Sequence, residues 1–207
     1  MRLGIFGGTF DPVHYGHLIL AEYCRVECKL DQVWFLPAAV PPHKQDRELT
    51  ANDQRLQMLQ LALAGHEKMK VSMLELERGG VSYTLDTLEA IHQQQSDVEL
   101  FFLLGADSLH ELPTWRDPDR ICQLANLVVV HRPDVPAPDF SVLDGIAGQD
   151  QQDRLQGLAV AMPLIQLSST EIRHRVAAGQ SIRYQTPRAV EKYIETQRLY
   201  TNIIVGE

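Results

Sequence analysis

The fold is decided near the N-terminus, where residues 3–20 read LGIFGGTFDPVHYGHLIL. The apolar run at 3–6 is typical of a short buried strand, and Gly7 and Gly8 end it with a turn. A helical pattern of apolar residues follows over 16–29. The stretch therefore predicts a strand, a glycine-rich turn and a helix, in that order.

The same alternation continues along the rest of the chain. Further apolar runs predict strands at 33–36, 71–76, 98–104, 127–130 and 160–167, and helices are predicted over 50–64, 82–94, from 118 onward and up to 178. Thr50, with Asp53 three residues on, is the predicted N-cap of the second helix. Near-continuous apolar strands separated by helices predict an open, doubly wound α/β fold, with a mostly parallel sheet and helices on both faces.

Length and composition fit one globular domain. The 207 residues are 44% hydrophobic and 22% charged, which excludes a disordered, collagen-like or disulfide-stapled chain. We expect a single domain over 1–207, with a surface excursion at about 133–157 where Pro, Asp and Gln accumulate. The net charge of −8 disfavours sequence-independent binding to nucleic acid or to anionic membranes. Three cysteines, no signal peptide and no 18-residue apolar run favour a cytoplasmic protein.

The strongest chemical signal follows the first strand. His14 and His17 lie three residues apart at the start of the first predicted helix, so both imidazoles can face the same side. A helix N-terminus favours anions, and Gly7 and Gly8 let a ligand approach the backbone closely. The pattern indicates a phosphate site that needs no metal ligand from the protein.

Two plainer interpretations of the histidine pair stay open at this point. The segment can be a glycine-rich turn that carries two surface histidines. A zinc site is disfavoured, because the Glu of an H-E-x-x-H motif and a nearby cysteine ligand are both missing.

A second signal follows the last predicted strand, where residues 167–173 read LSSTEIR. Ser168 and Thr170 can cap a helix, and capping alone is the plain interpretation. Arg173 lies one turn inside that helix, where a cation opposes the helix dipole unless an anion binds there. Two helix N-termini facing one crevice could hold a triphosphate from both sides.

Other candidates lie at the same predicted edge of the sheet. Gly105 and Asp107 end the fourth strand, where a carboxylate can accept hydrogen bonds from ribose hydroxyls or cap the next helix. Trp115, in a Pro-bounded loop, suits a flat ligand as well as burial. Three further residues, His43, Lys44 and Arg132, are cations or potential cations in loops, and each could simply be solvated.

Together these motifs resemble the bacterial nicotinate-mononucleotide adenylyltransferases, within the HxGH nucleotidyltransferase superfamily. The matches, in family order, are G-G-x-F-D-P-x-H-x-G-H at 7–17, P-P-H-K at 41–44, S-Y-T-x-x-T-L at 82–88, G-A-D at 105–107, P-T-W at 113–115, R-P at 132–133 and S-x-T-x-I-R at 168–173. The H-x-G-H element by itself indicates nucleotidyl transfer. The P-P-H-K, Y-T-x-x-T-L and P-T-W elements resemble those of the pyridine-nucleotide enzymes.

The resemblance implies a Rossmann-like fold and transfer of AMP from ATP to nicotinate mononucleotide, with Mg²⁺ carried by the ATP phosphates. It implies that His14, His17 and Arg173 are catalytic. The implied ATP-binding residues are Gly7, Gly8, Thr9, Phe10, His14, His17, Gly105, Asp107, Ser168, Thr170 and Arg173. The implied binding residues for nicotinate mononucleotide are His43, Lys44, Thr84, Trp115 and Arg132. No metal ligand is implied among the protein side chains.

Several rival functions share the same motifs. Within the superfamily these are nucleotidyl transfer to nicotinamide mononucleotide, phosphopantetheine or glycerol phosphate. From another class, a nucleotide-binding regulator could keep the crevice without turnover. The partners implied are ATP and nicotinate mononucleotide, without nucleic acid or membrane, and the sequence leaves a homo-oligomer open.

Overall fold

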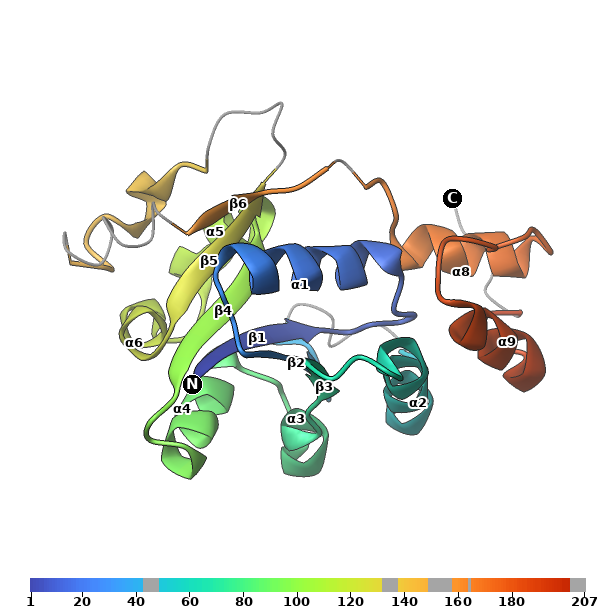
Figure 1. The fold of residues 1–207 in the computed structure, drawn as a ribbon, viewed down its shortest axis with the longest axis horizontal. Coiled ribbons are helices and arrows are strands. Elements are labelled where there is room, and N and C mark those ends of the chain that lie inside the picture. Colours follow the sequence, from blue (N-terminus) through green and yellow to red (C-terminus); the bar gives the residue numbers. More distant parts are fainter. Residues whose placement is uncertain (43–48, 132–137, 149–157, 164, 202–207) are drawn as a thin grey trace.

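The computed structural model describes residues 1–207 except 43–48, 132–137, 149–157, 164 and 202–207. One or more helices follow each strand along the chain (Figure 1), and the elements are β1 Arg2–Gly8, α1 Tyr15–Glu27, β2 Gln32–Pro37, α2 Asn52–Leu63, β3 Met69–Val71, α3 Leu74–Arg78, α4 Thr84–Gln94, β4 Glu99–Gly105, α5 Ala106–Glu111, η2 Leu112–Thr114, α6 Pro118–Leu124, β5 Asn126–His131, η3 Phe140–Leu143, β6 Ala159–Ala161, α8 Ser169–Ala177 and α9 Arg188–Gln197.

The strands form one sheet in the order β3-β2-β1-β4-β5-β6, and every pair of neighbours is parallel. The predicted doubly wound α/β fold is confirmed, and in the described residues the sheet is wholly rather than mostly parallel. The chain proceeds from β1 to β2 and β3 on one side, then returns to place β4 on the other side of β1. The switch point therefore lies between the carboxyl ends of β1 and β4, where such sheets bind ligands.

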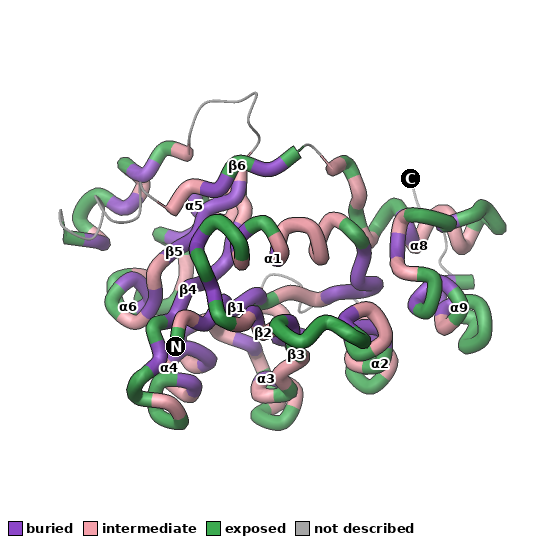
Figure 2. The backbone as a smooth tube through the Cα atoms, viewed as in Figure 1, coloured by how far each residue is buried: buried purple, intermediate pink, exposed green. Residues whose placement is uncertain are grey.

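Helices cover both faces of the sheet and give two hydrophobic layers. One layer contains Cys24 of α1, Met58 of α2 and Ile194 of α9. The opposite layer contains Leu88 of α4 and Cys122 of α6. Figure 2 shows the buried residues running through the central strands, with exposed residues on the outer sides of the helices. Each fully buried apolar side chain contributes roughly 1.5–3 kcal/mol, so both layers stabilise the sheet between them.

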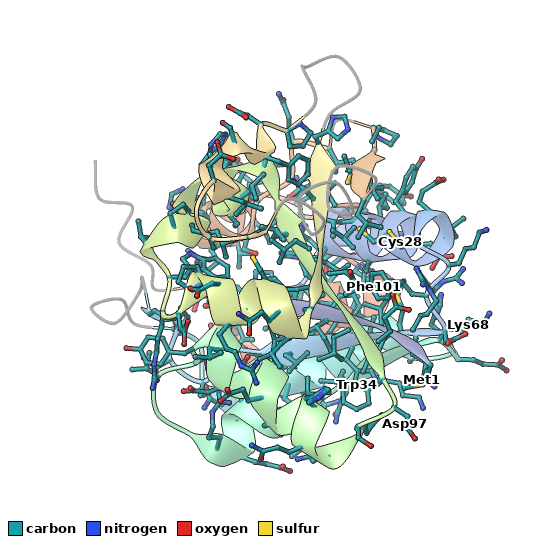
Figure 3. All side chains as sticks on the ribbon, turned by 90° about the vertical axis from the view of Figure 1, so that its left-hand side faces the viewer. Met1, Cys28, Trp34, Lys68, Asp97 and Phe101 are labelled. Carbon is teal, nitrogen blue, oxygen red and sulfur yellow. The ribbon has the colours of Figure 1, made fainter. Side chains whose placement is uncertain are left out.

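The strands all begin at one end of the molecule. Figure 3 looks onto that end, where Met1, Lys68 and Asp97 lie close together, each one or two residues before a strand. Because the strands are parallel, their carboxyl ends all meet at the opposite edge. The candidate residues of the sequence analysis follow those carboxyl ends.

Two predicted strands need correction. The strand predicted over 71–76 ends at Val71, and α3 begins at Leu74. The helix buries Glu75, which accepts a hydrogen bond from the Thr87 hydroxyl at 2.8 Å, and this tertiary contact prevails over the local alternation. The strand predicted over 160–167 is β6, which ends at Ala161, because its partner β5 ends at His131 and Pro163 has no N–H for a ladder bond.

The predicted N-cap at Thr50 is wrong. Helix α2 begins at Asn52 with Ala51 at the N-cap position. The Thr50 backbone N–H instead donates to Asp11 Oδ2, and its carbonyl accepts from Arg55. The backbone of Thr50 is therefore hydrogen-bonded to Asp11, in the loop after β1, and to Arg55. The local sequence gives no sign of these tertiary contacts.

The predicted surface excursion at 133–157 is described over residues 138–148. Phe140 and Leu143 of η3 are buried there, in the layer that also holds α4 and α6. The rest of the excursion lies outside the described residues. None of the described helices has both the length and the apolar character needed to cross a membrane.

Candidate active site

Three adjoining cavities lie along the carboxyl ends of the strands. The apolar cavity, of about 350 Å³, includes Gly7, Gly8, Thr9, Thr84 and Trp115 in its lining. The histidine cavity, also about 350 Å³, includes Thr9, His14, His17, Ser168, Thr170 and Arg173. The strand-end cavity, about 510 Å³, includes His14, His17, Gly105, Asp107 and His131. Thr9 lines the first two cavities and both histidines line the last two, so each cavity adjoins the next in a row.

The two histidine rings are stacked, with their centroids 3.7 Å apart and their planes 26° from parallel. The backbone N–H of His14 donates to Nδ1 of His17 at 3.2 Å. A neutral imidazole that accepts at Nδ1 carries its proton on Nε2. His17 therefore presents an N–H donor from its other nitrogen, which is the group that a phosphate oxygen needs.

His14 is held in its neutral form. Its side chain is buried, and this burial lowers its pKa to about 4. Its Nδ1 has no hydrogen-bond partner among the described residues. A buried polar atom without a partner is costly unless a ligand satisfies it. This nitrogen lies against Gly16 and is closed off from solvent, so the burial of the ring, rather than a ligand, accounts for its neutral form.

Gly16, between the two histidines, leaves room for the imidazole ring of His14. A Cβ at this position would lie 3.0 Å from both Cε1 and Nδ1 of His14. Real Cβ contacts at that distance are rare, so a side chain here would displace the imidazole. The glycine lets the His14 ring fold back over the first turn of α1.

Backbone N–H groups at the N-terminus of α1 already donate hydrogen bonds within the protein. The N–H of Tyr15 donates to the carbonyl of Gln185, and the N–H of His17 donates to the carbonyl of His14. A helix N-terminus usually leaves its first N–H groups unpaired, and here some of them are already taken up. An anion there would meet the two imidazoles and the positive end of the helix dipole, with fewer free backbone donors than expected.

Helix α8 provides the opposite wall of the histidine cavity, and its start lies beside the start of α1 (Figure 1). The Ser168 hydroxyl accepts a hydrogen bond from the N–H of Glu171 at 3.1 Å, so Ser168 is the N-cap of α8, as predicted. The N–H groups of Ser169 and Thr170 have no acceptor within the helix, which is the general condition of a first turn. The Ser169 hydroxyl donates to the carbonyl of Pro12 and fixes α8 against the loop after β1.

The Arg173 side chain extends from α8 to the loop after β1. Its Nη1 donates to the carbonyl of Asp11 at 2.8 Å, and its Nη2 donates to the Thr170 hydroxyl at 3.3 Å. Both bonds use neutral acceptors, so the positive charge of the guanidinium is not neutralised by either contact. This arrangement holds a cation beside both histidines, as the sequence analysis predicted.

The apolar cavity lies under the start of α4. Thr84 is the first residue of that helix, and the preceding Tyr83 provides no side-chain cap. Trp115 packs edge-on against Phe102, with ring centroids 5.9 Å apart. The indole N–H of Trp115 is buried and has no hydrogen-bond partner among the described residues. The cavity thus combines an aromatic wall with the hydroxyl of Thr84.

The strand-end cavity contains Gly105 and Asp107. Gly105 is the N-cap of α5, and Asp107 is exposed within the first turn. Asp107 is therefore not the cap of this helix. Its carboxylate lies at the rim, where it can accept hydrogen bonds from a ligand.

One of the predicted residues that the structure describes, Phe10, is not among those that line these three cavities. Phe10 is buried at 1% exposure and packs edge-on against His17, with centroids 5.1 Å apart. Its side chain therefore supports the His17 ring from behind, and a contact with ATP would have to come from its backbone. His43, Lys44 and Arg132 lie outside the described residues.

The sequence analysis missed several residues that shape the site. Glu75 and Thr87 line the apolar cavity and are hydrogen-bonded to each other. Arg55 is completely buried beneath the loops that carry Thr9 and Ala38. A signal for Arg55 exists, because it shares the helical spacing of the buried Met58 and Leu59 and so places an arginine on the apolar face of α2.

Comparisons with known proteins agree with this geometry. The sequence profile of the cytidylyltransferase-like proteins matches residues 5–175. A protein of Thermomicrobium roseum named "Probable nicotinate-nucleotide adenylyltransferase" is 48% identical over 202 residues, which cover 98% of this chain and 92% of that protein. A protein of Geobacillus thermodenitrificans with the same name is 42% identical, over 96% of this chain and 86% of that protein.

The chain belongs to the nicotinate-nucleotide adenylyltransferase family. Among solved structures, the nicotinic acid mononucleotide adenylyltransferase of Plasmodium falciparum, complexed with NaAD, matches with a TM-score of 0.73. The two share 19% sequence identity, over 96% of this chain and 97% of the other. That likeness supports the fold, while family membership rests on the sequence relatives.

Proposed function

We propose that the protein transfers the AMP moiety of ATP to nicotinate mononucleotide and releases pyrophosphate, which forms deamido-NAD. The observation that carries this proposal is the row of three adjoining cavities with the histidines in the middle. A dinucleotide has a base at each end and phosphates at its centre. The apolar cavity suits the pyridine end, the histidine cavity the phosphates, and the strand-end cavity the adenosine.

The triphosphate of ATP is assigned to the histidine cavity. His14, His17 and Arg173 line it together with Ser168 and Thr170. The donors come from α1 on one side and α8 on the other, and both helices direct their positive ends toward the gap. Gly7 and Gly8 end β1 and line the adjoining apolar cavity, while Thr9, the first residue of the loop after β1, lines both cavities. The two glycines are proposed to let ATP approach the backbone closely where these two cavities meet.

The reaction needs positioning and charge stabilisation rather than proton abstraction. A phosphate oxygen of the acceptor attacks the α-phosphorus of ATP, and the bond from that phosphorus to the bridging oxygen of the β-phosphate breaks. The phosphate of the acceptor is already an anion near neutral pH, so no general base is required. Negative charge grows on the leaving pyrophosphate, where the Nε2–H of His17 and the Arg173 guanidinium can stabilise it.

Mg²⁺ is proposed as the companion of ATP. The ion usually keeps several waters and binds through substrate phosphates with one or two carboxylates, and it supplies charge neutralisation there. The donors that line the histidine cavity are mainly N–H and hydroxyl groups, which fit phosphate oxygens that carry a metal ion. Asp11 lines the cavity, but its two carboxylate oxygens accept hydrogen bonds from Thr50 and Tyr200.

The pyridine end is assigned to Thr84 and Trp115. The Thr84 hydroxyl lines this cavity and can donate, and first-turn N–H groups of α4 lack acceptors within the helix, whereas Trp115 provides an aromatic wall. A nicotinate carboxylate only accepts hydrogen bonds, whereas the amide of nicotinamide also brings two donors of its own. The donor set therefore favours the carboxylate. His43, Lys44 and Arg132 are proposed to meet the phosphate end of the acceptor.

The proposed location is the cytoplasm. The three cysteines, all within the described residues, form no disulfide and are buried. Burial raises the pKa of Cys28 and of Cys122 to about 11, which keeps both thiols protonated and unreactive.

The test is an acceptor panel. The purified protein is incubated with Mg-ATP or Mg-CTP and with nicotinate mononucleotide, nicotinamide mononucleotide, phosphopantetheine or glycerol phosphate, and pyrophosphate release is measured. We expect the highest kcat/KM with ATP and nicotinate mononucleotide. Faster release with any other pair, or no release with any pair, contradicts the proposal.

A further inference from the structure

Arg55 is the largest side chain that is completely buried in the described part of the protein. Burial lowers its pKa, yet an arginine stays charged inside a protein. Placing a cation in the interior is costly unless its donors are all satisfied and a counter-charge lies near. The surroundings of Arg55 therefore need an explanation beyond packing.

The guanidinium of Arg55 binds the backbone of the loops that end two neighbouring strands. Its Nη1 donates to the carbonyl of Thr9 at 2.8 Å, in the loop after β1. Its Nη2 donates to the carbonyl of Ala38 at 2.7 Å, and its Nε donates to the carbonyl of Thr50 at 3.0 Å, both in the loop after β2. One side chain thus fixes the relative position of two loops that line the apolar cavity.

Asp11 supplies the counter-charge and extends the network. Its side chain is 3% exposed. Oδ2 accepts from the N–H of Thr50, and Oδ1 accepts from the hydroxyl of Tyr200 at 2.7 Å. The backbone carbonyl of Asp11 is also the acceptor for Nη1 of Arg173. The position of Asp11 therefore sets the position of the cation in the histidine cavity.

Tyr200 connects this network to the far end of the chain. It lies 189 residues after Asp11, is 9% exposed and packs in the same layer as α2 and α9. Its hydroxyl contacts Met58 Sδ as well as Asp11. Asp11 lines the histidine cavity and Tyr200 does not, so Tyr200 can act on the reacting groups through Asp11.

We propose that Arg55 and Tyr200 are positioning residues, which hold Asp11 and Thr9 so that Arg173 and the loop after β1 meet the triphosphate in a productive geometry. The proposal rests on the adenylyl transfer proposed above. Neither side chain lines the histidine cavity. Both act on the reaction through Asp11 and the loop backbone.

Tyr200→Phe is the sharpest test, because it removes one hydroxyl and keeps the ring in the core. We expect kcat/KM for ATP to fall about tenfold, since the buried Asp11 oxygen loses its donor and Asp11 shifts. Tyr193→Phe is the matched control, because Tyr193 packs against the same layer and the described residues show no hydrogen bond to its hydroxyl. It should keep wild-type kinetics.

A double-mutant cycle separates positioning from general stability. Tyr200→Phe is combined with Arg173→Ala, and kcat/KM for ATP is measured for all four proteins. If Tyr200 acts through Arg173, its removal should cost less than twofold once Arg173 is absent. An equal fold loss in both backgrounds, or a lower Tm with unchanged kinetics, overturns the proposal.

Arg55→Lys provides a second variant that keeps the charge but replaces the planar fork with a single ammonium. We expect kcat/KM to fall more than tenfold.

Calorimetric Kd values for Mg-ATP, measured without an acceptor, separate this proposal from the proposed function. Wild-type protein that binds Mg-ATP but shows no turnover with nicotinate mononucleotide contradicts the function. Unchanged ATP affinity and turnover in both Arg55→Lys and Tyr200→Phe contradict the positioning roles.

Discussion

Acid should destabilise the fold through His14. Its pKa of about 4 in the folded protein lies well below the ordinary 6.5, because burial disfavours the charged ring. Between these two values the unfolded chain binds a proton that the folded protein does not bind. The unfolded state thus holds more protons in this window, and the free energy of unfolding falls as the pH falls. Each pH unit inside the window costs about 1.4 kcal/mol, so the loss between pH 7 and pH 5 is about 2 kcal/mol.

Urea unfolding at pH 7 and pH 5 measures this loss. His14→Asn keeps a polar side chain that cannot take up the proton, so its stability should fall by about 2 kcal/mol less than that of the wild type over the same interval. His92→Asn is the control, because His92 is an exposed histidine on α4, and this variant should keep the wild-type loss. If His14→Asn loses as much stability as the wild type between the two pH values, the reasoning about the buried neutral imidazole is refuted.

Three further predictions concern turnover. His17→Ala should lower kcat by about 10²-fold or more with the fold intact, since a preorganised donor to the developing charge is worth roughly 3–4 kcal/mol; near-wild-type turnover, or an unfolded variant by circular dichroism, would overturn its role. Arg173→Ala should raise KM for ATP more than KM for the acceptor, and Arg173→Lys should recover part of the loss; equal effects on the two substrates would mean a purely structural arginine. Trp115→Ala should raise KM for the pyridine nucleotide by about tenfold and leave KM for ATP nearly unchanged, by analogy with aromatic stacking on bases; an ATP-specific defect would move Trp115 to the adenine side.

The fold was largely predictable because each strand is a short apolar run and each helix carries its own period. The parallel sheet, the two covered faces and the helix after Ser168 follow from those patterns, whereas the order of the strands came only from the structure. The errors occurred where tertiary contacts decide local structure. Residues 74–76 alternate apolar and polar side chains as a strand would, but they begin α3, whose Glu75 accepts a hydrogen bond from Thr87 of α4.

The residues that face the cavities were found because they occur in compact motifs, such as 7–17 and 168–173. The residues that hold those motifs in place were not found. The helical spacing of Arg55 indicates its burial, but its backbone-carbonyl partners leave no trace in residue types, and Tyr200 meets Asp11 across 189 positions of sequence. Such partners become visible only when the chain has folded and the distances between them are known.

Acceptor choice tests the central claim most directly. Initial rates are measured with Mg-ATP and either nicotinate or nicotinamide mononucleotide, and the dinucleotide product is identified by its mass. The donor set around Thr84 and Trp115 predicts that kcat/KM for the nicotinate compound exceeds that for the amide by at least about 10²-fold, with deamido-NAD as the product. Equal efficiency with the two acceptors, or the absence of a dinucleotide product, would contradict it.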